Sequence, residues 1–195
     1  MIQKVLFLAV LLMAASPASA QTIAGVDMPE TLTVGSDTLF LNGAGLREKY
    51  ALGLDVYVAG LYLKSKSSDW QTIIQAEDPM AIRLHIVTKL ITPGKFTDST
   101  REGFEYSCAN QHIDITTIKS DIDRFVEIFK SGIAKDDVYD ITYIKDVGVQ
   151  VFKNGSKTPV VTIQNPTLKK ALFGIWLTES PEAYLRVVRK AMLGI

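Results

Sequence analysis

The sequence predicts an α+β fold in which helices pack on one face of a mainly antiparallel sheet. Two observations on the order of the segments indicate this class. Segments typical of strands come first and segments with helical spacing follow, and a second group of strands then precedes two closing helices. Consecutive strands favour antiparallel pairing, and helices grouped along the chain favour one side of such a sheet. Because no repeat or Pro/Ser-rich linker divides the chain, we expect a single domain.

Residues 1–20 have the pattern of a signal peptide. Lys4 supplies the positive charge of the N-terminal region, residues 5–15 form the apolar region, and Ala18-Ser19-Ala20 has the small residues of a cleavage site. The apolar stretch is shorter than the ~20 residues that a membrane helix needs. We therefore expect cleavage after Ala20 and a periplasmic or secreted domain of residues 21–195 with no integral membrane span. An uncleaved anchor is the alternative.

The charge and the cysteine content limit the partners and the chemistry. Of the 21 basic and 21 acidic residues, only Lys4 lies in the leader, which leaves 20 basic against 21 acidic residues. This balance lacks the basic footprint of nucleic-acid-binding proteins, so no nucleic-acid partner is expected, whereas protein partners stay open. Cys108 is the only cysteine, so an intrachain disulfide is impossible. We expect a buried thiol, with a reactive or intermolecular thiol as the alternative.

The first strands are expected in the N-terminal part of the chain. Residues 31–34 and 38–41 are two strands joined by the turn Gly35-Ser36-Asp37. Residues 55–63 are apolar on both faces for much of their length, which predicts a central strand. Residues 82–88 are expected to form another strand.

The spacing of apolar residues then becomes helical. Residues 97–110 predict a first helix, and Ser120 is the expected N-cap of a second helix that ends at Gly132. Asn154-Gly155 predicts a type I′ turn. The remaining elements are three strands at 138–144, 147–152 and 160–163, and two helices at about 166–177 and 181–192, which open at Asn165-Pro166 and Ser180-Pro181.

Several catalytic motifs are missing from the chain. It has no Walker-type loop, no dinucleotide-binding glycine motif, no Gly-x-Ser-x-Gly and no His-Glu-x-x-His. His85 and His112 lie far apart and lack partners at metal-ligand spacing. The pair Asp136-Asp137 lacks the further oxygen ligands that calcium requires. We therefore expect neither a metal ion nor a cofactor.

The segment that carries most chemical information contains Arg47. We interpret the Gly-rich stretch around residues 42–46 as a flexible turn that places Arg47 just before a strand with Tyr57 and Tyr62. An arginine fork donates to a carboxylate or enolate oxygen, and a tyrosine hydroxyl can add a second bond. Tyr62 would face the opposite side of the sheet from Tyr57. The alternative is an exposed loop arginine followed by a core strand.

Three segments follow one another in a characteristic order: Gly43-Ala44-Gly45-Leu46-Arg47, the strand Val56 to Leu63, and Phe173-Gly174-Ile175-Trp176-Leu177. With the closing helix that ends Lys190-Ala191-Met192-Leu193-Gly194, they resemble the chalcone isomerase-like family, in particular its bacterial secreted branch. The likeness runs roughly from Gly25 to the end of the chain. It implies the family's open-faced β-sandwich, an α+β fold with a mainly antiparallel sheet and helices packed on one face.

The resemblance also implies roles for two residues. In plant chalcone isomerases, the arginine that matches Arg47 neutralises an enolate-like oxygen during ring closure. A threonine on the next strand and a Tyr-Lys-Asn set on a helix complete that site. Here Tyr57 stands at the threonine position, and the Tyr-x-x-Lys-x-x-x-Asn pattern is missing around residues 95–101. Chalcone isomerase activity is therefore not expected, and the arginine–tyrosine pair resembles the family's fatty-acid-binding members.

We therefore predict a non-enzymatic protein that binds a small amphipathic anion such as a fatty acid. Arg47 and Tyr57 would hold the carboxylate, and the tail would lie between sheet and helices. The candidate walls, each also compatible with plain core packing, are Phe104, Phe125, Phe129, Leu172 and Trp176.

Two alternatives stay open. The first is an isomerase or lyase that acts on an α,β-unsaturated carbonyl compound. There Arg47 would stabilise an oxyanion, and Tyr57 or His85 would move the proton. The second is a ligand-free interaction scaffold whose pocket is filled by side chains.

Overall fold

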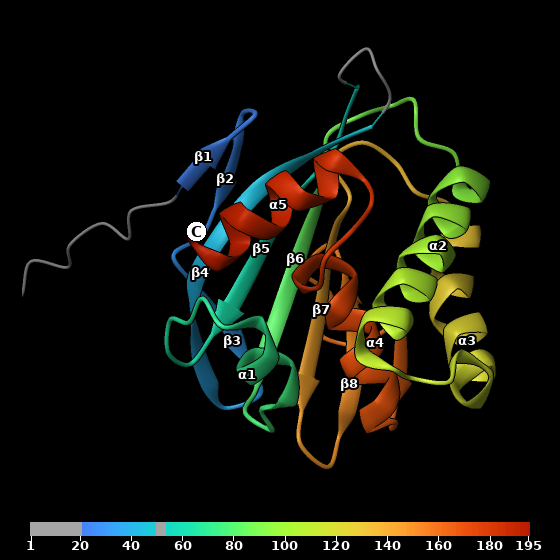
Figure 1. The fold of residues 1–195 in the computed structure, drawn as a ribbon. Helices are drawn as coiled ribbons and strands as arrows, with labels where there is room; N and C mark the ends of the chain where they lie inside the picture. Colours follow the sequence, from blue (N-terminus) through green and yellow to red (C-terminus); the bar gives the residue numbers. More distant parts are fainter. Residues whose placement is uncertain (1–20, 50–53) are drawn as a thin grey trace, which may run out of the picture.

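A computed structural model describes residues 21–49 and 54–195 of the chain; the predicted signal peptide, residues 1–20, lies outside the described residues. The main element is a seven-stranded sheet (Figure 1). Its strands are β3 (Thr31–Val34), β4 (Asp37–Lys49), β5 (Leu54–Leu63), β6 (Met80–Ile86), β7 (Val138–Ile144), β8 (Gly148–Lys153) and β9 (Val161–Ile163). They lie side by side in chain order, and every neighbouring pair is antiparallel.

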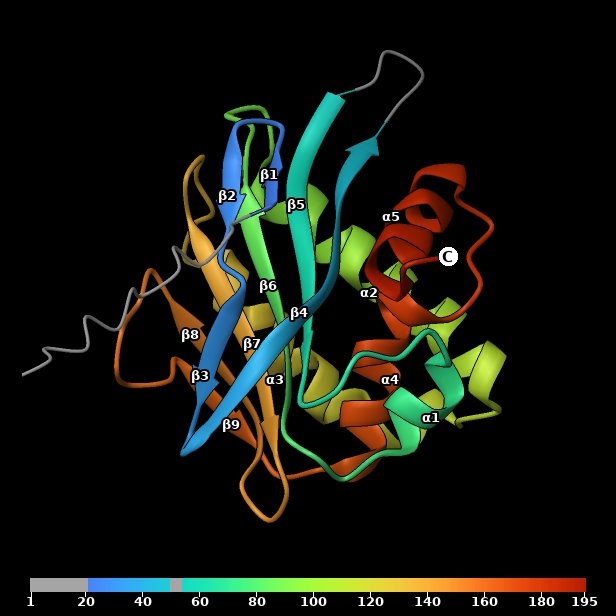
Figure 2. The same ribbon diagram turned by 90° about the vertical axis from the view of Figure 1, so that its left-hand side faces the viewer.

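The helices gather on one face of this sheet, as Figure 2 shows. They are α1 (Trp70–Gln75), α2 (Pro93–Gln111), α3 (Lys119–Lys130), α4 (Pro166–Leu177) and α5 (Ala183–Leu193). The larger of two apolar cores lies between these helices and the sheet. The predicted α+β class, with a mainly antiparallel sheet and helices on one face, is confirmed, and the sheet is open rather than closed into a barrel.

The Gly-rich segment before Arg47 is a strand, so the interpretation of this segment as a flexible turn is wrong. β4 runs through residues 42–49 and pairs with β5, with two shifts in register. Gly43 and Gly45 permit close packing rather than a bend. A Cβ atom at Gly43 would collide with the carbonyl oxygen of Ala191, and one at Gly45 would lie 2.9 Å from the Cβ atom of Ala191. The two glycines therefore let α5 lie directly on the sheet.

The strand register assigns the candidate residues to one face of the sheet. Arg47 is opposite Tyr57, and Tyr57 is opposite Ile86. Because directly opposed residues of antiparallel strands share a face, all three lie on the helix side, where Tyr57 and Ile86 belong to the larger core. Val58 is opposite His85, so both lie on the other face. The candidate anion site is thus on the face that the helices cover.

The other face of the sheet carries a smaller apolar core. A hairpin of β1 (Gln21–Ile23) and β2 (Val26–Met28) covers it, and Met28 packs there with Val58 and Tyr62. The Tyr62 hydroxyl donates to the carbonyl oxygen of Pro29 over 3.0 Å. Tyr62 therefore faces away from the helices, as predicted. β1 and β2 are not predicted from the sequence, because three residues are too few to show a period.

Local signals in the sequence locate most other elements. Thr92 caps α2, Asn165 caps α4 as predicted, and Asn154-Gly155 has the two positive φ angles, 51° and 71°, of a type I′ turn. The prediction of Ser120 as an N-cap is wrong. A 3₁₀ turn, Ile115–Ile118, runs directly into α3 and places Ser120 inside the helix.

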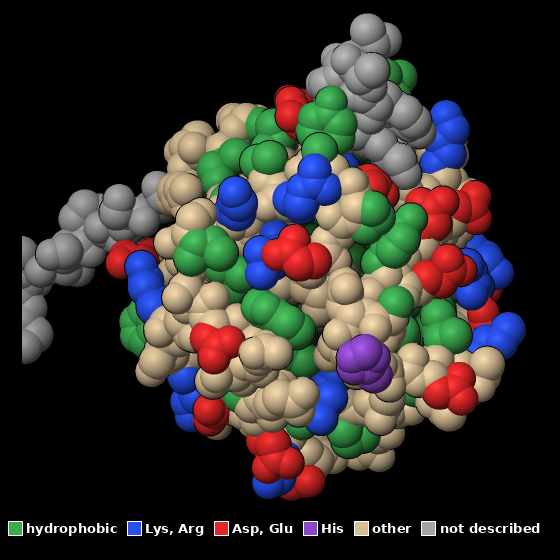
Figure 3. All heavy atoms as spheres, in the orientation of Figure 1, with side chains coloured by type: hydrophobic (Ala, Val, Ile, Leu, Met, Phe, Trp, Pro, Cys, Tyr) green, Lys and Arg blue, Asp and Glu red, His purple; other side chains and the backbone are tan. Residues whose placement is uncertain are grey.

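The described surface carries charges of both signs. Figure 3 shows acidic and basic side chains interspersed over the face that α5 occupies in Figure 1. Within residues 21–49 and 54–195, the helices are all too short or too polar to cross a bilayer.

Candidate functional site

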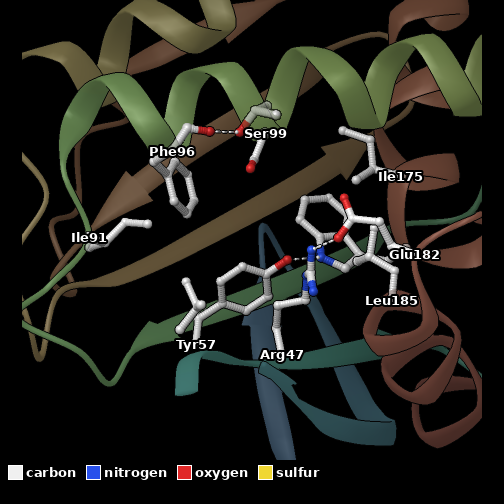
Figure 4. Close-up of a pocket in the computed structure, with 11 residues that line it drawn as sticks. Arg47, Tyr57, Ile91, Phe96, Ser99, Ile175, Glu182 and Leu185 are labelled. Carbon is white, nitrogen blue, oxygen red and sulfur yellow. Dashed lines mark hydrogen bonds and ion pairs between the residues drawn. The ribbon is translucent and has the colours of Figure 1, made fainter. Parts of the chain in front are cut away.

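A small cavity lies between the sheet and the helices beside Arg47 (Figure 4). Its volume is about 50 Å³. Its apolar lining comes from Val56, Ile91, Phe96, Ile175, Trp176 and Leu185, and its polar lining from Arg47, Tyr57, Ser99, Thr100 and Glu182. The cavity therefore combines apolar walls with the cation of Arg47 and the carboxylate of Glu182.

Arg47 is buried, with only 4% of its surface exposed. It follows Gly43 and Gly45 on the same face of β4, near the point where α5 begins. Its Nη1 atom donates to the backbone carbonyl of Glu48, and its Nη2 atom donates to the carboxylate of Glu182. Such partners are required because an unpaired charge in an apolar site is costly. The alternative of an exposed loop arginine is therefore wrong.

Tyr57 lies directly opposite Arg47 on the neighbouring strand. Its hydroxyl oxygen accepts a hydrogen bond from Trp176 Nε1 over 3.0 Å. Burial raises the pKa of Tyr57 above its ordinary value, and the charge of Arg47 offsets only part of this shift. The phenol therefore stays protonated at neutral pH, which suits a hydrogen-bond donor rather than a base.

Glu182 belongs to the site although the sequence patterns do not single it out. It lies in the connector between α4 and α5, 135 residues after Arg47, and its side chain is 28% exposed. Figure 4 shows its carboxylate reaching Arg47 from the side, while Arg47 and Tyr57 point from the sheet toward α2. The one local signal is its place just after Ser180-Pro181, where an acidic residue at a helix start is common.

A family model described as chalcone isomerase-like matches residues 20–194. The chain belongs to the chalcone isomerase-like family. The resemblance inferred from the sequence motifs is therefore confirmed at the level of the family, and the bacterial secreted branch stays a prediction.

A solved plant protein shares this fold. The chalcone isomerase-like chain is similar to a fatty-acid-binding protein of Arabidopsis thaliana, with a TM-score of 0.71 and 19% sequence identity. The match covers 90% of this chain and 96% of the Arabidopsis chain. At this identity the likeness shows a shared fold. No curated protein matches the chain in sequence.

In this member of the family, only Trp176 of the five predicted wall residues lines the cavity. Phe104, Phe125 and Phe129 are fully buried and pack edge to face, with successive ring centroids 5.9 and 5.7 Å apart. Leu172 is also fully buried in the larger core. These four side chains fill the space between the sheet and the helices, so the structure places them in the core rather than at the cavity.

Phe96 separates the cavity from this aromatic row. Its ring centroid lies 6.3 Å from that of Tyr57 and 4.7 Å from that of Phe129. A ligand tail would reach the row only if the Phe96 side chain moved. The sequence-based prediction starts the helix at residue 97 and thereby misses Phe96, whereas α2 begins at Pro93.

The other candidate residues lie away from the cavity. His85 is on the opposite face of the sheet, where its Nε2 atom is 3.9 Å from Asp136. His112 is exposed and ends α2 in a left-handed conformation. Among the residues that the structure describes, no three His, Cys, Asp or Glu side chains are grouped in a way that would hold a metal ion.

Proposed function

We propose that this protein binds a small amphipathic carboxylate, most simply a fatty acid. The observation that carries the proposal is the buried Arg47 beside Tyr57 at the edge of an apolar cavity. A carboxylate at this point would accept charge-assisted hydrogen bonds from the guanidinium and a further bond from the phenol. Ile91, Phe96 and Leu185 would contact the first carbons of the tail. The Arabidopsis protein of the same fold, which binds fatty acids according to its name, supports this ligand class.

The binding is proposed to be non-enzymatic. An isomerase or lyase would need a group that moves a proton at the site. His85 lies on the opposite face of the sheet, and burial keeps Tyr57 protonated by raising its pKa. Both proton carriers considered for the enzyme alternative are therefore poorly suited to that role.

The proposed location is the periplasm or the outside of a bacterial cell. The charged start, apolar core and small-residue end of residues 1–20 support export and cleavage after Ala20. A carrier that acts there meets lipids outside the inner membrane, in keeping with the expected bacterial secreted branch of the family.

The small size of the cavity favours a second candidate function. A volume of about 50 Å³ is well below that of established ligand pockets, which is about 300–1,000 Å³. An acyl tail would fit only if side chains such as Phe96 and Leu185 moved apart. A ligand-free interaction scaffold, in which side chains fill the pocket, needs no such movement.

Native mass spectrometry with organic extraction separates the two candidates. We would compare the mature wild-type protein with Arg47→Ala, and use Arg83→Ala as the control. Arg83 is a matched arginine because it pairs with Asp140 on the opposite face of the sheet. The carrier function predicts a fatty acid that co-purifies with the wild type and Arg83→Ala and is lost from Arg47→Ala.

Two results would contradict the carrier function. An Arg47→Ala protein with full affinity for fatty acids would exclude Arg47 as the anion-binding group. A wild-type protein that carries no lipid and also ignores added decanoate would favour the scaffold.

A further inference from the structure

Arg47 already has a carboxylate partner inside the protein. Both terminal nitrogens of its guanidinium are engaged, Nη1 by the backbone carbonyl of Glu48 and Nη2 by the carboxylate of Glu182. Recognition of a ligand carboxylate by an arginine fork is strongest when two parallel hydrogen bonds form. A ligand carboxylate that binds in this way would therefore either share the guanidinium with Glu182 or take the place of Glu182.

Glu182 is the partner that can leave. The Glu48 carbonyl belongs to the backbone of β4 and moves only with the strand. The Glu182 side chain belongs to a connector and is 28% exposed, so it can rotate toward the solvent, where its carboxylate is hydrated. Glu182 also precedes the first residue of α5 and makes no side-chain capping bond. A released carboxylate would stay close to the positive end of the α5 dipole, which favours negative charge.

The charge of the site also favours displacement over sharing. Arg47 and Glu182 together are neutral, and the Arg47 side chain is only 5% exposed. A second carboxylate beside this pair would leave one uncompensated negative charge next to an apolar cavity. Two carboxylates in close contact repel each other, and a buried unpaired charge is strongly disfavoured. The ligand carboxylate and the Glu182 carboxylate therefore compete for one cation.

We infer that Glu182 is an internal competitor whose carboxylate occupies the anion site on Arg47 and is displaced by the carboxylate of the ligand. This inference rests on the proposed function. It makes Glu182 a determinant of affinity and of head-group choice, because a neutral head group brings no charge that can replace the carboxylate at Arg47. Displacement also releases the link between β4 and the start of α5, next to Leu185 in the cavity wall.

Titration of the delipidated mature protein with decanoate and with 1-decanol tests the inference. Glu182→Gln keeps the shape of the side chain and removes its charge. We expect it to bind decanoate about five- to tenfold more tightly than the wild type, within the usual range of coupled equilibria, and to bind 1-decanol no more tightly. Glu179→Gln is the matched control, because Glu179 lies in the same connector but pairs with Arg189 over 3.0 Å. It should bind decanoate as the wild type does.

A thermal-shift measurement gives a second readout. Without ligand, Glu182→Gln leaves the buried Arg47 without a charged partner and should unfold at a lower temperature than the wild type. Decanoate should then raise its melting temperature more than it raises that of the wild type. Glu182→Ala serves the same test if the glutamine variant folds poorly.

The outcomes distinguish the inference from the proposed function. If the wild type binds decanoate through Arg47 but Glu182→Gln binds it equally or more weakly, the competitor role is wrong and the carrier function stands. Equal gains for decanoate and 1-decanol would mean that the substitution only loosens the site, which also overturns the inference. If neither the wild type nor Glu182→Gln binds decanoate, both proposals fail.

Discussion

Four side chains from four different segments form a continuous polar chain at the candidate site. Trp176 of α4 donates to Tyr57 of β5, Tyr57 lies opposite Arg47 of β4, and Arg47 donates to Glu182 before α5. Each group is buried or partly buried among apolar neighbours, where an unmade hydrogen bond costs about 1–3 kcal/mol. The chain of contacts therefore holds the candidate anion-binding groups in place and makes them interdependent.

Tyr57→Phe separates the binding role of the hydroxyl from its role in stability. The variant removes the acceptor of Trp176 Nε1, so we expect a loss of about 1–3 kcal/mol in the free energy of unfolding. It also removes the proposed donor to the ligand carboxylate, so decanoate should bind about tenfold more weakly. Urea denaturation and a decanoate titration measure the two effects.

Tyr62→Phe is the control for this substitution. Tyr62 is also buried and its hydroxyl also forms a hydrogen bond, to the backbone carbonyl of Pro29, but it lies on the opposite face of the sheet. Loss of the Tyr62 hydroxyl should lower the free energy of unfolding and leave decanoate binding unchanged. Unchanged decanoate binding by Tyr57→Phe would show that the phenol does not contact the ligand.

At the scale of the element, the strand β4 explains why a Gly-rich motif precedes the arginine. Gly43, Gly45 and Arg47 alternate along one face. Gly43 and Gly45 lie against Ala191 and Val188 of α5, so the helix packs directly on the backbone of β4. Arg47 lies near the first residue of α5, and its guanidinium therefore contacts the connector before α5 rather than the helix itself.

Gly45→Ala tests this packing. The added Cβ atom would lie 2.9 Å from the Cβ of Ala191 and 3.2 Å from the Cα of Val188, so α5 must shift. Overpacking of this kind costs about 1–3 kcal/mol, which we expect as a loss in the free energy of unfolding by urea. Gly94→Ala is the control, because a Cβ atom at Gly94 meets no atom within 4 Å. If both variants are equally stable, close approach of α5 is not the reason for Gly45.

At the scale of the whole molecule, the buried ammonium group of Lys169 connects α4 with α1 and with the sheet. Lys169 of α4 donates from Nζ to the carbonyl oxygens of Ile74 and Ala76, each over 2.7 Å. The same nitrogen lies 4.8 Å from the centroid of the Tyr143 ring of β7. Burial, with a contribution from the charge of Lys170, lowers the pKa of Lys169 to about 8.

This pKa predicts a pH dependence of global stability. The ordinary value is 10.5 and the native value is about 8, so between these pH values the unfolded chain binds more protons than the native chain. The free energy of unfolding therefore gains a term that rises with pH across this window. We expect the wild type to gain stability relative to Lys169→Met as the pH rises from 8 to 10.5, as measured by urea denaturation.

Groups present in both proteins cancel in this difference. One is Cys108, whose thiol is buried as predicted and whose pKa burial raises to about 11. Lys157→Met removes an exposed lysine and is the control for the loss of a lysine side chain. A constant difference between the wild type and Lys169→Met across the window would contradict the lowered pKa of Lys169.

Local sequence signals were sufficient to predict several elements. The long apolar strand around Tyr57, the Asn165 cap of α4 and the Asn154-Gly155 turn follow from residue periods and from backbone preferences that act over a few residues. The motifs also determined the family, and with it the pairing of Arg47 and Tyr57 as candidate anion-binding groups.

The surroundings of Arg47 depend on tertiary packing and could not be predicted from the sequence. Glycines typical of a turn lie in a strand because Val188 and Ala191 of α5, far later in the chain, pack against them. The predicted aromatic walls fill the core, and Glu182 completes the ion pair. These outcomes depend on how helices dock on the sheet. Docking is set by the shapes of residues far apart in the chain, which no local period or cap can encode.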